Sequence, residues 1–149
     1  MSDHESQELS PLTRRQGAAL IFDAVSVFSR IHRRISLSQI NTFLHVATHE
    51  GLTVAQLAEL CGISGAVMSR HLGDLGAYNR RREPGLGLVA MVQQIHGDRR
   101  ERRVVLTDKG VAFARQVAAA MRGGGPMANS IRRRRNHEPW SPAETGGTP

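Results

Sequence analysis

Two short helices in quick succession, each with its own start signal, constrain the fold of this chain more than any other feature. Thr53 and Gln56 have the S/T-x-x-Q spacing of a capping box, in which side chains satisfy the free backbone groups at a helix start. Apolar residues then recur with helical spacing until Gly62 ends the helix. Ser64 is placed to cap a second helix that runs to about Ala77. Two capped helices joined by a short glycine-containing turn predict a helix-turn-helix.

The segments around this motif predict a mainly α-helical domain with one small β-hairpin. Apolar residues recur with helical spacing on both sides of the motif, and an arginine-rich turn separates two strand-like runs that follow it. The expected elements are helices over 12–34, 36–50 and 107–122 and strands over 88–95 and 104–106. Ser36 and Gln39 have the spacing of a second capping box, and Thr107 is placed to cap the last helix. The predicted architecture is a winged helix-turn-helix domain flanked by N- and C-terminal helices, with the hairpin as the wing.

The ends of the chain differ from the middle in composition. Residues 1–11 show no apolar periodicity and are expected to form a loose N-terminus, so the domain with its dimerisation helices is assigned to 12–122. Three glycines and Pro126 are expected to end the last helix, which makes 123–149 a disordered basic tail rich in proline and glycine. The Arg132–Arg135 run either adds phosphate contacts or is only a solvated charge run, and the sequence leaves both readings open.

The net charge indicates which kind of molecule the chain binds, and the cysteine content indicates in which cellular compartment it is found. A formal net charge of +7 favours a polyanion, either nucleic acid or an anionic membrane surface. The only cysteine, Cys61, rules out an intramolecular disulfide and fits a reducing compartment. The polar N-terminus has no secretory signal, and every apolar run is far shorter than the roughly 20 residues of a membrane span. A cytoplasmic protein without a membrane partner is expected.

Two segments carry a resemblance to a known family. The residues LTVAQLAELCGISGAVMSRHLGDL (52–75) and DRRERRVVLTDKG (98–110) resemble the helix-turn-helix and the wing of the MarR family of winged-helix regulators. The resemblance runs from about Ile35 to Arg122 and implies a transcriptional regulator, most often a repressor, that binds a pseudopalindromic DNA site as a homodimer. It also implies room for a small-molecule effector, whose identity the sequence leaves open. The chain departs from the family in its longer loop over 78–87 and in having one C-terminal helix before the glycines.

The second helix of the motif is the expected reading element. A major groove admits one helix, and the N-terminal residues of that helix reach the base edges. Small side chains allow close approach, hydroxyls bind phosphate or base, and arginine grips phosphate or pairs with guanine. The expected contacts are Ser64, Gly65, Ala66, Ser69 and Arg70, with Thr53 at the start of the preceding helix. The simpler readings are that Ser64 is only an N-cap and Arg70 only a solvated charge.

Arginine clusters outside that helix are the second group of expected DNA contacts. The hairpin tip holds Arg99, Arg100, Arg102 and Arg103, and a narrow minor groove attracts inserted arginine. The family resemblance implies that Asp98 braces Arg100 there. Arg80, Arg81 and Arg82 lie in a segment so rich in glycine and proline that we expect flexible arginines, which supply affinity without sequence information. The alternative for both clusters is a solvated charged loop.

Other functions find little support in the sequence. No catalytic grouping, phosphate-binding glycine loop, cofactor motif or metal-ligand spacing is evident, so neither an enzyme nor a metal or cofactor site is expected. Cys61 is interpreted as a small core hydrophobe and His71 as a packed histidine. Apolar stripes, Ile21-Phe28-Ile31 and Val111-Val117-Met121, predict the dimer contact. The alternative function is a winged-helix module that docks proteins and binds nucleic acid only non-specifically.

Overall fold

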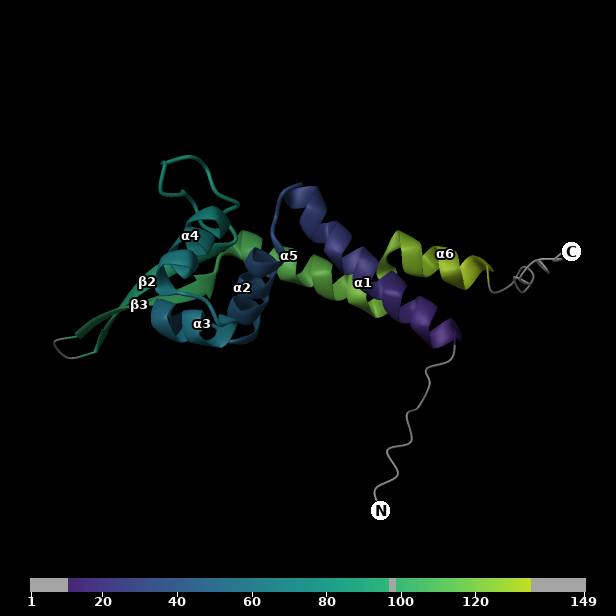
Figure 1. Cartoon of the computed structure of the whole chain (residues 1–149), viewed down its shortest axis with the longest axis horizontal. Coiled ribbons are helices and arrows are strands. Elements are labelled where there is room, and N and C mark those ends of the chain that lie inside the picture. Colours follow the sequence, from purple (N-terminus) through teal and green to yellow (C-terminus); the bar gives the residue numbers. More distant parts are fainter. Residues whose placement is uncertain (1–10, 97–98, 135–149) are drawn as a thin grey trace, which may run out of the picture.

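The computed structural model describes residues 11–96 and 99–134 and consists of helices around a small sheet (Figure 1). The helix-turn-helix elements and the sheet form one end, and three helices run toward the other end. The elements in chain order are α1 (Pro11–Ile31), α2 (Leu37–Thr48), β1 (Leu52–Thr53), α3 (Val54–Cys61), α4 (Gly65–Leu75), β2 (Val89–His96), β3 (Arg99–Leu106), α5 (Asp108–Ala119), the π-helical turn η1 (Ala120–Gly124) and α6 (Pro126–Arg134). The expected fold, a winged helix-turn-helix flanked by N- and C-terminal helices, is confirmed.

Local capping signals determine where the middle helices begin. Ser36 and Thr53 each accept a hydrogen bond from the backbone N–H three residues later, and the glutamine at that position bonds back to the cap, so both predicted capping boxes form. Ser64 caps α4 and Thr107 caps α5 in the same way without the returning side chain. Each cap satisfies backbone donors that a helix start otherwise leaves unpaired.

Three phenylalanines on three helices form the centre of the core. The rings of Phe28 on α1, Phe43 on α2 and Phe113 on α5 lie edge to face, with centroids 5.1 to 5.8 Å apart. This geometry places the positive edge of one ring against the negative face of the next. The cluster therefore ties the helix-turn-helix end of the molecule to the long helices.

The sheet is antiparallel with strand order β1-β3-β2. The register pairs Val89 with Leu106 at the base of the hairpin and His96 with Arg99 at its far end. The sequence reading placed residues 97–103 in a turn, which is wrong, because β3 begins at Arg99. The strand continues through the β-branched residues Val104 and Val105 toward the body of the domain. The paired strands β2 and β3 form a long, narrow projection (Figure 1).

The expected end of helical structure at Gly123 is also wrong. The chain bends at Gly123, which has φ +81°, and then forms α6, which lies along α1. The carboxylate of Asp23, a buried residue on α1, accepts hydrogen bonds from the backbone N–H groups of Met127 (3.0 Å) and Ala128 (2.9 Å). A Cβ at Gly125 would overlap that carboxylate. Asp23 therefore caps α6 from another helix, and glycine allows the approach.

None of the described helices is long and apolar enough to cross a membrane.

Candidate nucleic-acid interface

Helices α3 and α4 form the helix-turn-helix, and their inner faces are fixed in the core. Leu57 on α3 and Met68 and Leu72 on α4 are buried. Between the helices, Gly62 adopts the left-handed conformation with φ +63° and its N–H bonds to the carbonyls of Ala58 and Glu59. This glycine turn reverses the chain within three residues, 62–64, so α4 is held rigidly with one face turned outward.

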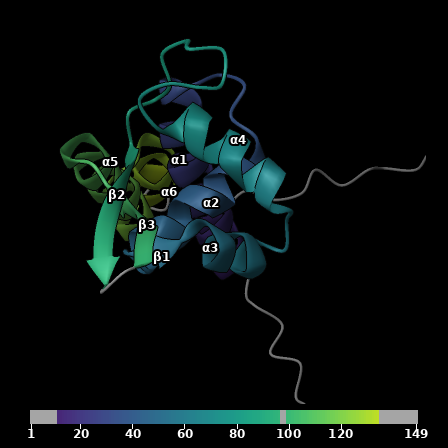
Figure 2. The same ribbon diagram turned by 90° about the vertical axis from the view of Figure 1, so that its left-hand side faces the viewer.

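The outward face of α4 contains the predicted reading residues, and Figure 2 shows the ribbon of this helix beside α2 and α3. Two hydroxyls on it already serve the helix, because Ser64 Oγ accepts from Val67 N (3.3 Å) and Ser69 Oγ donates to the Gly65 carbonyl (2.8 Å). Arg70 makes no hydrogen bond or ion pair within the described residues, so its guanidinium is free for an external partner. The exposed residues of this face are Ser64, Gly65, Ala66, Ser69 and Arg70.

Thr53 lies at the junction of the sheet and α3. Its hydroxyl accepts from Gln56 N (3.2 Å), and its backbone pairs with Arg103 of β3. The side chain is half-buried. Its capping role is therefore established by geometry, while contact with DNA stays a prediction.

The wing carries its exposed arginines on β3. Arg100 and Arg102 are both exposed, opposite Ile95 and Gln93 of β2. The projection extends well beyond α3 and α4 (Figure 1), which allows it to reach a surface beside the one that α4 faces. Asp98 and the side chain of Arg99 lie outside the described residues, so the predicted brace between Asp98 and Arg100 is not described.

Arg103, which the sequence reading placed at the hairpin tip, instead anchors the wing to the body of the domain. Its Nη1 donates to the Gly51 carbonyl (2.7 Å) and its Nη2 to Glu101 Oε2 (2.9 Å). Its buried Nε has no hydrogen-bond partner among the described residues. The signal available in the sequence was the spacing Glu101-x-Arg103, which places both side chains on the same face of a strand.

The loop with Arg80, Arg81 and Arg82 has exposed side chains on a closed backbone. All three side chains are exposed, as predicted for phosphate contacts. The backbone, however, is closed by Asn79, whose Oδ1 accepts from Arg81 N (2.9 Å) and from Glu83 N (3.0 Å). An asparagine that bonds the backbone two residues on forms an Asx turn, which holds a loop in one conformation. The mobility of the loop stays a prediction, and its backbone is closed by hydrogen bonds that glycine and proline content alone did not indicate.

A half-buried polar cluster supports α4 from behind. Asp74 accepts from Gln39 Nε2 (2.9 Å), which connects α4 to the cap of α2. Thr42 Oγ1 donates to the Ser38 carbonyl (3.0 Å) and lies within hydrogen-bond distance of His71 Nδ1 (3.1 Å). Both connections fix the rotation of α4 about its axis, because they hold two residues of one helical turn.

Burial also alters the titration of two groups in this region. Burial lowers the pKa of His71, and the nearby charge of Asp74 acts in the opposite direction. Burial raises the pKa of the half-buried Cys61 thiol, against a smaller lowering by its hydrogen bond with Thr42. A raised pKa disfavours the reactive thiolate, which agrees with the interpretation of Cys61 as a core residue.

The lowered pKa of His71 predicts that the domain loses stability in mild acid. The unfolded chain binds a proton at His71 more readily than the folded chain, so stability should fall as pH drops below about 6.5, the ordinary value. Thermal unfolding followed between pH 7.5 and 5.5 measures this, and His71→Gln should flatten the decline. An equal decline in both proteins would assign the effect to other groups.

The part of the chain that the structure describes has no metal site and has an open hollow between two of its long helices. No group of three or more His, Cys, Asp or Glu side chains is placed to hold a metal ion there. An open hollow of about 300 Å³ lies between α1 and α5. Its lining combines apolar Val27 and Phe113 with the cations of Arg30 and Lys109.

Comparison with known proteins shows a family resemblance for the helix-turn-helix region. A sequence model of the MarR family matches residues 35–77, the segment from the start of α2 to the end of α4. A search of the curated proteins gives no match. The predicted resemblance to the MarR family is confirmed for this segment.

Solved structures extend the likeness over most of the chain. The crystal structure of RV1404 from Mycobacterium tuberculosis is similar with a TM-score of 0.57 and 21% identity, over 83% of this chain and 74% of that one. The apo form of wild-type MarR from E. coli is similar with a TM-score of 0.50 and 16% identity, over 88% of each chain. The chain therefore shares its fold with these two structures over most of its length.

Proposed function

We propose that this chain is a DNA-binding transcriptional regulator of the MarR type, and not an enzyme, that acts as a homodimer in the cytoplasm. In this proposal α4 enters the major groove and the wing reaches the adjacent minor groove. The chain represses by occupying a pseudopalindromic site near a promoter.

The observation that carries the proposal is the exposed face of α4 with a free Arg70. A reading helix needs small outward residues at its N-terminal end, a side chain that can pair with a base edge, and rigid support. Gly65, Ala66 and Arg70 meet the first two needs. The buried Met68 and the Asp74–Gln39 bond meet the third.

Selection of bound fragments from random duplex DNA by the full chain tests the proposal. Recovery of an inverted repeat whose half-sites lie about 10 bp apart, or a multiple of that, supports both reading and dimerisation. Recovery of no preferred sequence, with equal affinity for any duplex, would contradict it. A reporter gene placed behind the recovered site then shows the sign of regulation.

The Arg70→Ala variant should weaken binding to the recovered site by about 1–3 kcal/mol and relax the preference at one base position, as expected for loss of a base contact. A panel of single-base variants of the site measures both effects. Arg115→Ala, which removes an exposed arginine from α5, is the control for charge. Unchanged affinity and preference would remove Arg70 from the reading face.

The Arg100→Ala variant should lower affinity more on flanks rich in A·T than on flanks rich in G·C. A narrow A·T minor groove concentrates negative potential, so the loss of an inserted arginine is felt most there. Affinity for one site in two flanking contexts measures the difference. Equal losses in both contexts would leave only a general charge effect at the wing.

The dimer surface of this proposal differs from the stripes that the sequence suggested. Phe28 and Val117 are buried in the chain's own core and cannot meet a partner. The exposed apolar side chains instead include Ile21, Phe22 and Val25 on α1 and Met121 on η1. Contiguous exposed apolar surface on a small domain indicates an interaction site. Sedimentation at micromolar concentration tests the dimer, and a monomer that binds a single half-site would contradict it.

The hollow between α1 and α5 supports a small-molecule effector as part of the proposal. Its apolar and cationic lining is complementary to a small anion with an apolar body. It lies beside Phe113, which joins the long helices to the helix-turn-helix end. Titration calorimetry with small aromatic and aliphatic carboxylates tests this part, and no binding by any of them would remove it.

A second candidate function is supported by the exposed apolar side chains of β2. Met91, Val92 and Ile95 are exposed on the edge strand of the wing. An edge strand with apolar side chains can pair with an extended peptide. The chain would then be a protein-docking module that binds nucleic acid non-specifically. The same DNA selection separates the two functions, because a docking module recovers no preferred site.

A further inference from the structure

The segment that joins α4 to β2 is a small closed hairpin with three consecutive arginines. We call residues Tyr78–Pro84 the basic hairpin. Tyr78 and Pro84 form an isolated antiparallel bridge, Asn79 N donates to the Glu83 carbonyl (2.9 Å), and Arg82 N donates to the Asn79 carbonyl (3.0 Å). These bonds, together with those of the Asn79 side chain, determine the path of the backbone between the two ends.

Side-chain bonds and backbone conformation give the arginines a defined arrangement. Asn79 Nδ2 donates to Glu83 Oε2 (2.8 Å), so the only carboxylate of the hairpin is bonded to its own turn. Arg82 has φ +59°, the only non-glycine residue with positive φ among the described residues. A left-handed residue in a closed turn projects its side chain in a direction that a flexible loop would not maintain.

The basic hairpin is also fixed to the end of α4. Three successive backbone N–H groups bond back to it, from Leu86 to the Asp74 carbonyl (2.8 Å), from Gly87 to Gly76 (2.8 Å) and from Leu88 to Leu75 (2.7 Å). A Cβ at Gly85 would overlap the carbonyl oxygens at the end of α4. Glycine at this position therefore brings the returning strand into direct contact with the helix, and the backbone bonds tie the hairpin to the end of α4.

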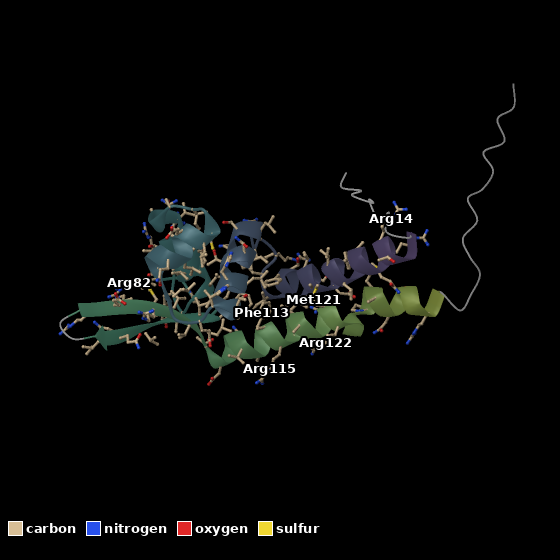
Figure 3. The ribbon with its side chains drawn as sticks, turned by 90° about the horizontal axis from the view of Figure 1, so that it is seen from below. Arg14, Arg82, Phe113, Arg115, Met121 and Arg122 are labelled. Atoms are coloured by element: carbon tan, nitrogen blue, oxygen red, sulfur yellow. The ribbon has the colours of Figure 1, made fainter. Side chains whose placement is uncertain are left out.

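The basic hairpin lies at the C-terminal end of α4, which in the proposed complex is at the edge of the major groove. Helix α4 has eleven residues and is therefore about 16 Å long, whereas a major groove is about 12 Å wide. An element at the C-terminal end of a helix whose N-terminal end reads the groove thus lies over the phosphates at the groove edge. Figures 1 and 2 show the hairpin beyond that end of α4, apart from the wing. Figure 3 shows Arg82 at the same end of the molecule as the wing, away from Arg14.

From these observations we propose that the basic hairpin is a rigid phosphate clamp that grips the DNA backbone at one defined position beside the site of α4. The inference rests on the proposed DNA-binding function and adds a third contact to α4 and the wing. Flexible arginines would neutralise phosphates anywhere nearby, whereas a clamp fixed to α4 binds only where the backbone has the position that α4 in its groove requires. The hairpin thereby couples affinity to the correct docking of the reading helix.

Two variants separate a clamp from a flexible charge. The first, Arg80→Gln/Arg81→Gln/Arg82→Asn, removes the three charges and keeps at 82 a residue that tolerates positive φ. The second, Asn79→Ala, keeps all three arginines and removes the three hydrogen bonds of the Asn79 side chain, while the backbone bonds of the turn can still form. The charge control is Arg14→Gln/Arg115→Gln/Arg122→Gln, which removes three exposed arginines that Figure 3 places on the long helices. Far-ultraviolet circular dichroism and thermal unfolding establish that each variant is folded.

The measurement is affinity of the full chain for the selected duplex at several salt concentrations. Each lost phosphate contact makes the slope of log affinity against log salt shallower by about 0.9, so the hairpin triple variant should lose about two to three of these steps. Asn79→Ala should show more than half of the decrease in slope that the triple variant shows, although its net charge is unchanged. Asn79→Ser, whose hydroxyl can accept from the backbone, should recover part of the slope. The Arg14/Arg115/Arg122 control should keep the slope of the unaltered chain.

Uncharged methylphosphonate groups placed at single positions of the duplex then locate the contact. Binding by the unaltered chain should drop at one or two adjacent phosphates in each half-site, and binding by the hairpin triple variant should be insensitive there. Full affinity and slope in Asn79→Ala, with loss in the triple variant, would overturn the clamp in favour of flexible charge. Equal behaviour of the hairpin triple variant and its control would overturn any contact. Failure to select a site at all would instead contradict the proposed function.

Discussion

The Phe113→Ala variant is expected to lower the free energy of unfolding by about 3–5 kcal/mol, the usual cost of removing a buried phenylalanine side chain. Phe113 contacts Phe28 and Phe43 at ring-centroid distances of 5.1 and 5.4 Å, so its removal leaves a cavity at the meeting point of α1, α2 and α5. Urea unfolding followed by circular dichroism gives the value.

The matched change Phe113→Leu keeps most of the volume and should cost less than about 1.5 kcal/mol. The difference between the two variants therefore measures the cavity rather than the loss of an aromatic ring. A cost below 1 kcal/mol for Phe113→Ala would contradict the position of this residue at the centre of the core.

The Gly110→Ala variant is expected to destabilise the domain by at least about 3 kcal/mol, at the upper end of the cost of overpacking. A Cβ at this position, in the first turn of α5, would overlap the Leu88 carbonyl oxygen at the base of the wing. That obstacle is backbone, and Leu88 O also accepts from Thr107 N (3.0 Å), so it cannot move without breaking the junction of hairpin and helix.

Gly17→Ala is the matched control, because nothing lies within 4 Å of a Cβ at that position of α1. Helix propensity alone makes alanine more stable than glycine by about 0.5–1 kcal/mol inside a helix, and Gly17→Ala should show this gain. The two substitutions should thus have opposite signs in urea unfolding. A gain in both would mean that α5 and the wing are not in contact at Gly110.

Elements whose signals are local could be predicted from the sequence. The caps at Ser36, Thr53, Ser64 and Thr107 depend on a side chain and a backbone group three residues away, and all four form where the spacing indicated. The outward face of α4 follows from the same local periodicity. The fold could therefore be predicted as far as the helix-turn-helix and the existence of a wing.

Features that depend on distant residues could not be predicted. The Gly-Gly-Gly-Pro run reads as a helix end, yet Pro126 is the first residue of α6, where proline is favoured because its missing N–H is not needed. The partner that makes this helix start stable is Asp23, a residue 104 positions earlier than Met127. Phe28 likewise looked available to a partner chain because its burial by Phe43 and Phe113 is tertiary.

In the candidate site, too, local features could be predicted and features that depend on the path of the backbone could not. Composition gave the arginines of residues 80–82 but not the turn around them, because the closing bonds of Asn79 depend on the path of the backbone. Arg103 and Glu101 are two residues apart, so in a strand they lie on the same face and can form their ion pair. The sequence instead predicted a turn for this run of charged residues. In both cases the presence of the charged residues could be predicted from the sequence, whereas the hydrogen bonds around them could not.

The cap that Asp23 places on α6 also has a consequence for the order in which the chain folds. Ribosomes make α1 before α6, so the backbone groups that the buried carboxylate of α1 satisfies are made 104 and 105 residues after it. Until then the carboxylate of Asp23 lacks these two backbone partners. Closing a loop of this length costs entropy that local contacts do not repay, so the helix-turn-helix should form early and the pairing of α1 with α6 late. The nascent N-terminal helix is consequently the part of the molecule that chaperones have most reason to protect.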